Sequence, residues 1–150
     1  TISSFKNLES IELTHNDFSM DFELVFNQLS DLPKLSKLNV SRNPELRTLP
    51  QSITKLAALE ELNLHNNFNL DLEKEVTKLS TLKKLRIIDL GSLGIEKLPR
   101  DFGSLSNLEE ISFWGNDKLD FQSSFIILSK IKPLKKLIKV ASSVLFVQHL

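Results

Sequence analysis

The chain has 150 residues, of which 41% are hydrophobic and 25% charged, a balance typical of one globular domain. Lys and Arg together number 19, as do Asp and Glu, so the basic excess typical of nucleic-acid and polybasic membrane binders is missing. There are no cysteines, which excludes disulfides, thiolate metal sites and cysteine nucleophiles. We find no apolar run near the roughly 18 residues of a membrane span and no signal peptide, so we expect a soluble protein, whose compartment the sequence leaves unknown.

One pattern, L-x-x-L-x-L-x-x-N, recurs along the chain at intervals of 23 to 27 residues. Its five copies begin at Leu8, Leu35, Leu59, Leu85 and Leu108. The asparagine is present in four copies, as Asn16, Asn43, Asn67 and Asn116, and is replaced by Leu93 in the fourth copy. A degenerate sixth copy begins at Leu134 and places Lys139 where an apolar residue is expected.

These copies resemble the leucine-rich-repeat family over nearly the whole chain. The resemblance implies that each unit gives a short strand, a loop and a convex segment, and that the units stack into a horseshoe. Alternation such as Leu62-Asn63-Leu64 independently indicates a half-buried strand, and one unit cannot bury its own apolar edge without neighbours. We therefore predict an α/β fold, a right-handed leucine-rich-repeat solenoid with a parallel concave sheet of five or six strands and short convex helices.

Long and short units alternate, because every second unit carries about one extra helical turn. The apolar spacing of the long units predicts helices over Phe26–Leu32, Val76–Leu82 and Phe125–Ile131, preceded by the capping residues Asp21, Asp71 and Asp120. The short units predict a tighter turn or brief helix near Gln51–Lys55 and Asp101–Gly103, entered through Pro50 and Pro99. We expect each repeat asparagine to satisfy backbone groups after its strand, and a local departure at Leu93, helped by Gly91 and Gly94.

The predicted organisation is one domain over residues 1–150: a partial repeat at 1–7, five repeats over about 8–133, and a degenerate repeat or C-terminal cap at 134–150. In that last segment Val144–Val147 are candidates to fold over the final turn of the solenoid. Because Thr1 is not an initiator, we expect that an N-terminal part was removed, with a minimal cap as the alternative. Exposed terminal strands would permit self-association.

The side chains that flank the buried strand residues are expected to face the concave surface. They supply our candidate partner-binding residues: Asn63, His65, Ile87, Asp89, Glu110, Ser112 and Trp114. Ile87 and Trp114 interrupt an otherwise polar surface, and tryptophan is enriched at binding hot spots. The alternative is that Trp114 packs on a neighbouring repeat or under a loop.

Charges alternate in sign at the strand starts. The repeat register places Arg86 between Glu60 and Glu109, and Lys37 beside Glu61. We therefore favour pairing between neighbouring strands over a charged ligand patch.

Catalysis and metal binding are not expected. His65, Asp89 and Ser112 fall on consecutive repeats, but a triad needs the histidine in the middle, and an open strand face has no oxyanion hole. His15 and His65 lie two repeats apart, about 10 Å by strand spacing, which is too far for one metal.

The sequence therefore predicts a non-catalytic protein-binding module that uses its concave face and the adjoining loops, without cofactor or metal, and with no nucleic-acid or membrane partner. The partner itself stays unidentified. The alternative is a structural or regulatory repeat segment of a larger multidomain protein.

Overall fold

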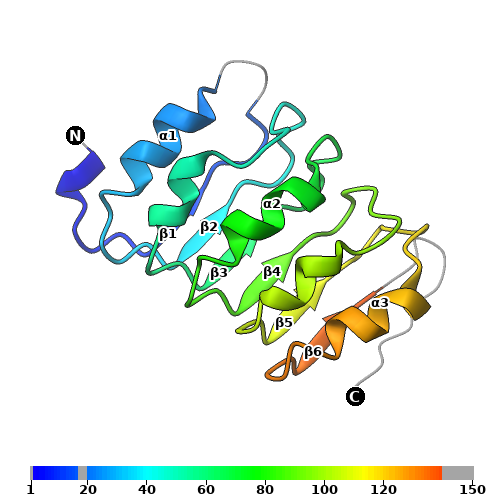
Figure 1. Cartoon of the computed structure of the whole chain (residues 1–150). Helices are drawn as coiled ribbons and strands as arrows, with labels where there is room; N and C mark the ends of the chain where they lie inside the picture. Colours follow the sequence, from blue (N-terminus) through cyan, green and yellow to red (C-terminus); the bar gives the residue numbers. More distant parts are fainter. Residues whose placement is uncertain (1, 17–19, 140–150) are drawn as a thin grey trace.

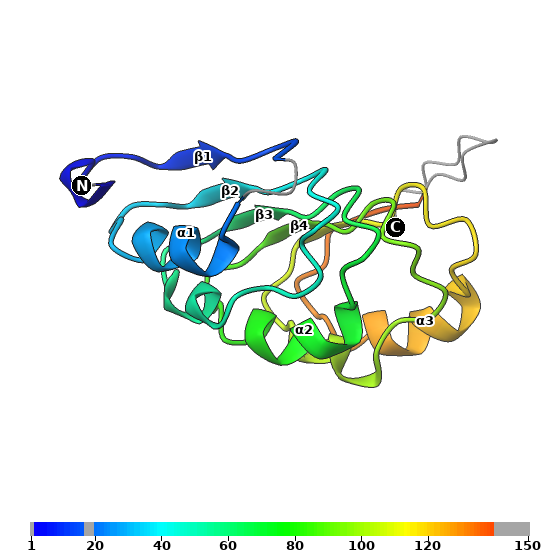
Figure 2. The ribbon, with the colours of Figure 1, turned by 90° about the horizontal axis from the view of Figure 1, so that it is seen from above.

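The structure is a computed structural model that describes residues 2–16 and 20–139. In this part of the chain, six three-residue strands form one parallel sheet in sequence order (Figure 1). They are β1 (Ser10–Glu12), β2 (Lys37–Asn39), β3 (Glu61–Asn63), β4 (Ile87–Asp89), β5 (Glu110–Ser112) and β6 (Lys136–Ile138). Every connection crosses the same side of the sheet, so the strands form one curved layer and the helices the other (Figure 2).

The two kinds of repeat differ in the segment that covers the sheet. Long repeats carry eight-residue α-helices, which are α1 (Phe22–Leu29), α2 (Leu72–Leu79) and α3 (Phe121–Leu128). Short repeats carry 3-10 helices, which are η1 (Ile2–Ser4), η2 (Gln51–Lys55) and η3 (Arg100–Ser104). The predicted alternation of long and short repeats is confirmed. None of the helices in the described residues is long and apolar enough to cross a membrane.

The predicted helix boundaries were wrong by three to four residues. Each α-helix begins directly after its aspartate and has ended before the last apolar residue of the predicted span. Leu32, for example, is buried but lies beyond the Ser30 C-cap, in a turn. The N–H of Leu32 donates to the Leu29 carbonyl in that turn. Apolar spacing reports which side chains face the core, and a turn can bury a leucine as well as a helix does.

The aspartates occupy the predicted N-cap positions, with one difference in bonding. Asp21 accepts a hydrogen bond from the N–H of Leu24 at 3.0 Å, and Asp120 accepts one from the N–H of Ser123 at 3.1 Å. Asp71 makes no such cap bond, and its carboxylate instead pairs with Lys74 at 2.8 Å.

The core lies between the sheet and the helices. The central residue of each strand points into it, and the register stacks these residues from one strand to the next. Four of them are almost fully buried: Leu38, Leu62, Ile88 and Ile111. Hydrophobic contact between successive turns therefore runs the length of the solenoid, as expected for repeats that cannot bury their own apolar edge.

The degenerate sixth repeat still forms a strand, since β6 pairs with β5 in the register Glu110↔Lys136. Lys139 occupies the position that is equivalent to the buried Leu64 and Leu90. Its ammonium donates a hydrogen bond to the Leu119 carbonyl at 3.1 Å. The same ammonium lies 5.1 Å from the ring centre of Phe121, within cation–π range. The proposed cap residues Val144–Val147 lie outside the described residues.

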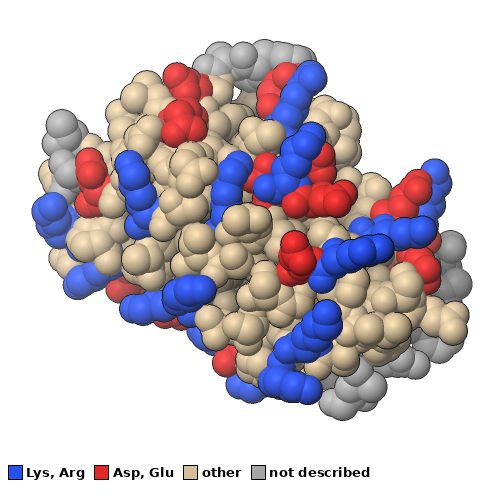
Figure 3. All heavy atoms as spheres, in the orientation of Figure 1, with Lys and Arg blue, Asp and Glu red and all other residues tan. Residues whose placement is uncertain are grey.

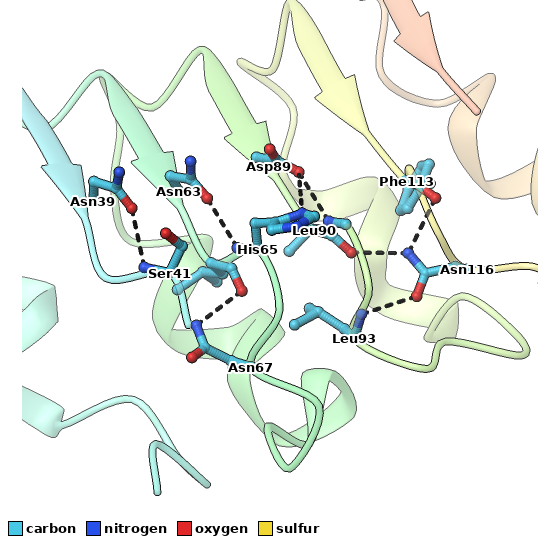
Figure 4. Close-up of polar contacts among 12 residues, drawn as sticks. Asn39, Ser41, Asn63, His65, Asn67, Asp89, Leu90, Leu93, Phe113 and Asn116 are labelled. Carbon is cyan, nitrogen blue, oxygen red and sulfur yellow. Dashed lines mark hydrogen bonds and ion pairs between the residues drawn. The ribbon is translucent and has the colours of Figure 1, made fainter. Parts of the chain in front are cut away.

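Buried asparagines join successive turns where the chain leaves the sheet (Figure 4). Asn67 donates to the carbonyls of Leu64 at 2.8 Å and Val40 at 3.0 Å, so its amide bonds both its own turn and the preceding one. Its side-chain oxygen accepts the N–H of Asn43 at 2.8 Å. Asn43 in turn accepts the N–H of Asn16 at 2.8 Å. We refer to this series of bonds as the asparagine ladder.

The predicted departure at Leu93 takes a specific form. Leucine has no amide oxygen. Asn116 of the next turn accepts the N–H of Leu93 at 3.1 Å (Figure 4) and also that of Ile95 at 3.0 Å. Gly94, between them, has a φ of 73°, a left-handed conformation that glycine adopts readily. The bond between Asn116 and Leu93 is equivalent to the bond between Asn67 and Asn43, so the ladder continues on the C-terminal side of Leu93. On the N-terminal side it is interrupted, because the leucine side chain has no oxygen to accept the N–H of Asn67.

We predict that Asn67→Ala destabilises the protein by about 2 to 4 kcal/mol, because it leaves buried backbone groups without partners. Urea denaturation followed by circular dichroism measures this free energy. Asn69→Ala is the control, since Asn69 is exposed and makes a single bond to the Pro44 carbonyl. Equal destabilisation by the two variants would show that the ladder contributes nothing specific.

Candidate functional site

The candidate site lies at the centre of the concave face, where the described residues of all six strands line a shallow groove. All seven residues predicted from the sequence lie on the neighbouring strands β3, β4 and β5 or just after β3 and β5. Asn63, Asp89 and Ser112 form one row across these strands, and Ile87 and Glu110 belong to a second row. His65 and Trp114 follow β3 and β5 at the carboxyl end of the strands.

Ion pairs within the sheet neutralise most charges around Ile87. Glu61 and Glu110 flank Ile87 in register, but each turns away from it to an outer strand. Glu61 pairs with Lys37 at 2.8 Å, and Glu110 pairs with Lys136 at 2.6 Å. Ile87, half-buried, therefore forms an apolar point between two neutralised carboxylates.

A second row of charges at the strand starts confirms the predicted pairing. The Arg86 guanidinium lies 2.9 Å from Glu60 and 3.5 Å from Glu109, and Lys135 lies 3.0 Å from Glu109. The hydrogen bond from Lys135 is the main cause that lowers the pKa of Glu109, and the bond to Glu60 raises the pKa of Arg86. On the helical face, too, charges of both signs are interspersed (Figure 3). Charge therefore marks neither face as a ligand patch.

Two of the predicted contact residues also hold the backbone. Asn63 accepts the N–H of His65 at 2.9 Å, and Asp89 accepts the N–H of Gly91 at 2.9 Å (Figure 4). These bonds to the residue two positions ahead fix the chain as it leaves the strand. Asn63 and Asp89 are consequently constrained in the directions that their side chains can take toward a partner.

His65 and Trp114 meet across a gap that Gly91 leaves open. The three residues occupy equivalent positions on consecutive turns, and the ring centres of His65 and Trp114 lie 5.5 Å apart, tilted by 40°. A Cβ at Gly91 would collide with Nδ1 of His65 and lie 3.0 Å from the Trp114 carbonyl. Gly91 thus contributes space for the His65 ring. Trp114 packs on His65 and is still 44% exposed.

The sequence reasoning missed residues that border this pair at the carboxyl edge of the sheet. Phe68, 59% exposed, lines the same surface groove as His65 and Trp114, together with Pro44, His15 and Arg42. The signal was available, because Phe68 directly follows the buried Asn67, at the position where other turns have Pro44 or Asp117. A large apolar residue in an exposed loop position is unusual enough to be noted.

The geometry offers little to catalysis. His65 Nδ1 lies 4.0 Å from Asp89, whose same oxygen already accepts the Gly91 N–H. The described residues contain no group of three His, Asp or Glu side chains that could hold a metal ion. What the arrangement provides is an open surface with a half-exposed indole, suited to contact with another macromolecule.

No protein-family model and no curated protein matches the chain. Solved structures do match it. Internalin C2 of Listeria monocytogenes, a leucine-rich-repeat protein, is 24% identical, with a TM-score of 0.64 over 92% of this chain and 54% of its own. The fold is an α/β leucine-rich-repeat solenoid. A chain in the Toll–Spatzle complex of Drosophila is 20% identical, with a TM-score of 0.53 over 79% of this chain and 18% of its own. The solenoid described here therefore spans about half the length of internalin C2.

We predict that Glu109→Gln lowers stability at neutral pH and that this loss disappears in acid. A lowered pKa means that ionised Glu109 stabilises the fold above the ordinary value of 4.5, and that this contribution is lost as the pH falls through the folded-state pKa. Urea denaturation between pH 7 and pH 3 would show the two proteins converging. Glu45→Gln, at an exposed and loosely paired carboxylate, should change little at any pH. A constant difference between Glu109→Gln and the parent at all pH values would contradict this.

Proposed function

We propose that the chain is a non-catalytic protein-binding module whose contact surface is centred on Trp114, His65 and Ile87. The observation that carries the proposal is the half-exposed Trp114 indole, held against His65 across Gly91. A large amphipathic ring already ordered before binding loses little conformational entropy on contact, which is why such residues dominate interface energetics.

The surroundings of these residues support the same proposal. The carboxylates beside Ile87 are paired within the sheet, so a partner would not have to desolvate unpaired charges at the centre of the face. Asn63, Asp89, Glu110 and Ser112 would supply a polar rim around that centre. Repeat solenoids commonly present such extended concave surfaces to other proteins.

A second candidate, a structural or regulatory segment of a larger repeat protein, has its own supporting observation. Phe125 of α3 is 43% exposed, although the equivalent Phe26 of α1 and Val76 of α2 are buried. The core is thus more open at α3 than elsewhere, and packing against a further element would cover it. In that case the end of the solenoid, rather than its concave face, would carry the main contact.

The two candidates separate in a binding experiment with matched variants. A partner is captured with the intact chain and purified, and its Kd is measured by calorimetry for Trp114→Ala and Ile126→Ala. Both remove exposed apolar side chains, and Ile126 lies on the helical side, 73% exposed. We expect Trp114→Ala to weaken binding about 30-fold or more and Ile126→Ala to have little effect. Loss of binding with Ile126→Ala alone would reject the concave-face proposal.

A further inference from the structure

A second groove adjoins the concave face at the carboxyl ends of the strands. We call it the carboxyl-edge groove and define it by six residues, one or more from each of the turns that contain β1, β2, β3 and β5. They are His15, Arg42, Pro44, His65, Phe68 and Trp114. The groove shares His65 and Trp114 with the proposed contact surface. It differs in apolar content and in charge from the shallow groove that the six strands line, which we call the floor.

The apolar content is concentrated here. Phe68 and Trp114 are two of the exposed large hydrophobic side chains of the described residues, and Pro44 and the His65 ring complete the same surface. Of the other four exposed members of that set, Leu24, Phe125 and Ile126 lie on helices α1 and α3, and Phe5 directly follows η1. The absence of a side chain at Gly91 lets the His65 ring lie against Trp114, so the two rings form one surface.

Charge separates the groove from the floor. The described lining of the groove contains one arginine and two histidines and no carboxylate, whereas the floor is lined by Glu12, Glu61, Asp89 and Glu110 with Lys37. Nη1 of Arg42 lies 3.1 Å from Nε2 of His15, and the described lining of the groove offers the guanidinium no carboxylate.

Arg42 is also held in an uncommon backbone conformation. Its φ is 59°, and its N–H donates to the His65 carbonyl at 2.9 Å, which keeps this conformation in place. The equivalent residues of the other described turns, His15, Asn66, Ser92 and Gly115, also have positive φ, so the repeat itself imposes this conformation. This conformation thus fixes the position of Arg42 in the groove.

We propose that the carboxyl-edge groove binds an extended segment of a partner protein that combines a carboxylate with an aromatic side chain. The carboxylate would bind Arg42 beside His15, and the aromatic ring would pack on Phe68 and Trp114. Parallel strands lie about 4.8 Å apart, so β2 and β5 place Arg42 and Trp114 about 14 Å apart across the sheet. An extended peptide covers that distance in about four residues. This inference rests on the proposed protein-binding function and specifies the chemistry of the partner.

Synthetic peptides test the inference without a known partner. The probes are acetyl-Asp-Ser-Gly-Ser-Phe-amide, its reversed sequence, and the same pair with Lys in place of Asp. Trp114 is the only tryptophan and the chain has no tyrosine, so intrinsic fluorescence reports on the groove directly. Backbone amide shifts in nuclear magnetic resonance spectra then map each contact to the groove or to the floor.

We expect an aspartate peptide to bind at least about tenfold more tightly than its lysine counterpart, with shifts at Arg42, Phe68 and Trp114. Arg42→Glu should reverse that preference, whereas Arg100→Glu, an equivalent charge change in η3 on the helical side, should leave it unchanged. Gly91→Ala should weaken both peptides, because the added Cβ displaces His65. Equal binding of aspartate and lysine peptides, no binding of either, or shifts confined to Ile87 and Glu110, would overturn the inference.

Failure of this inference and failure of the proposed function give different results. If a purified partner depends on Trp114 but is indifferent to Arg42→Glu, the protein-binding function stands and the acidic–aromatic specificity is wrong. If the aspartate peptide binds as expected while the purified partner ignores Trp114→Ala, the groove is real and the centre proposed for the partner is wrong.

Discussion

The asparagine ladder is the constraint on which the rest of the structure depends. Strands of three residues make few hydrogen bonds of their own, and the backbone leaves the sheet immediately after them. Asn43, Asn67 and Asn116 bind the carbonyls and N–H groups freed at that point, each across two turns of the solenoid. Buried backbone groups without partners would destabilise the fold by more than the hydrogen bonds of the short strands stabilise it. The ladder therefore fixes both the turn and the stacking of one repeat on the next.

The ladder also determines which side chains line up on the concave face. Because the chain leaves every strand in the same way, equivalent residues of successive turns form columns across the sheet. Charged columns pair internally, as Arg86 does with Glu60, and so stabilise stacking without offering a binding patch. The column of His65, Gly91 and Trp114 contains no ion pair between its members. Its glycine leaves room for the two rings to pack against each other. The contact surface that we propose thus lies where the repeat is least regular.

Repetition explains what could be predicted from the sequence. Five copies of one pattern determine strand order, register and the pairing of Arg86, since each property depends only on spacing. Helix ends were not predictable in this way, because Leu32 is buried by a turn and still matches helical spacing. The contact of His65 with Trp114 depends on a missing side chain at Gly91, and the exposure of Phe68 on a loop path. The contact of the two rings does not follow from a pattern of residue types, whereas the position of Phe68 directly after the repeat asparagine could have indicated its exposure.

The most direct test of the ladder is hydrogen exchange at the amides of Leu93 and Ile95, measured in the parent chain and in Asn116→Ala. Both amides belong to a connection outside the strands, and Asn116 is their acceptor. The account predicts slow exchange in the parent and acceleration of both by about tenfold or more in the variant, while the Val40 amide, bound to the Asn63 carbonyl, is unaffected. Exchange of Leu93 and Ile95 at the rate of an exposed loop in the parent chain would contradict it.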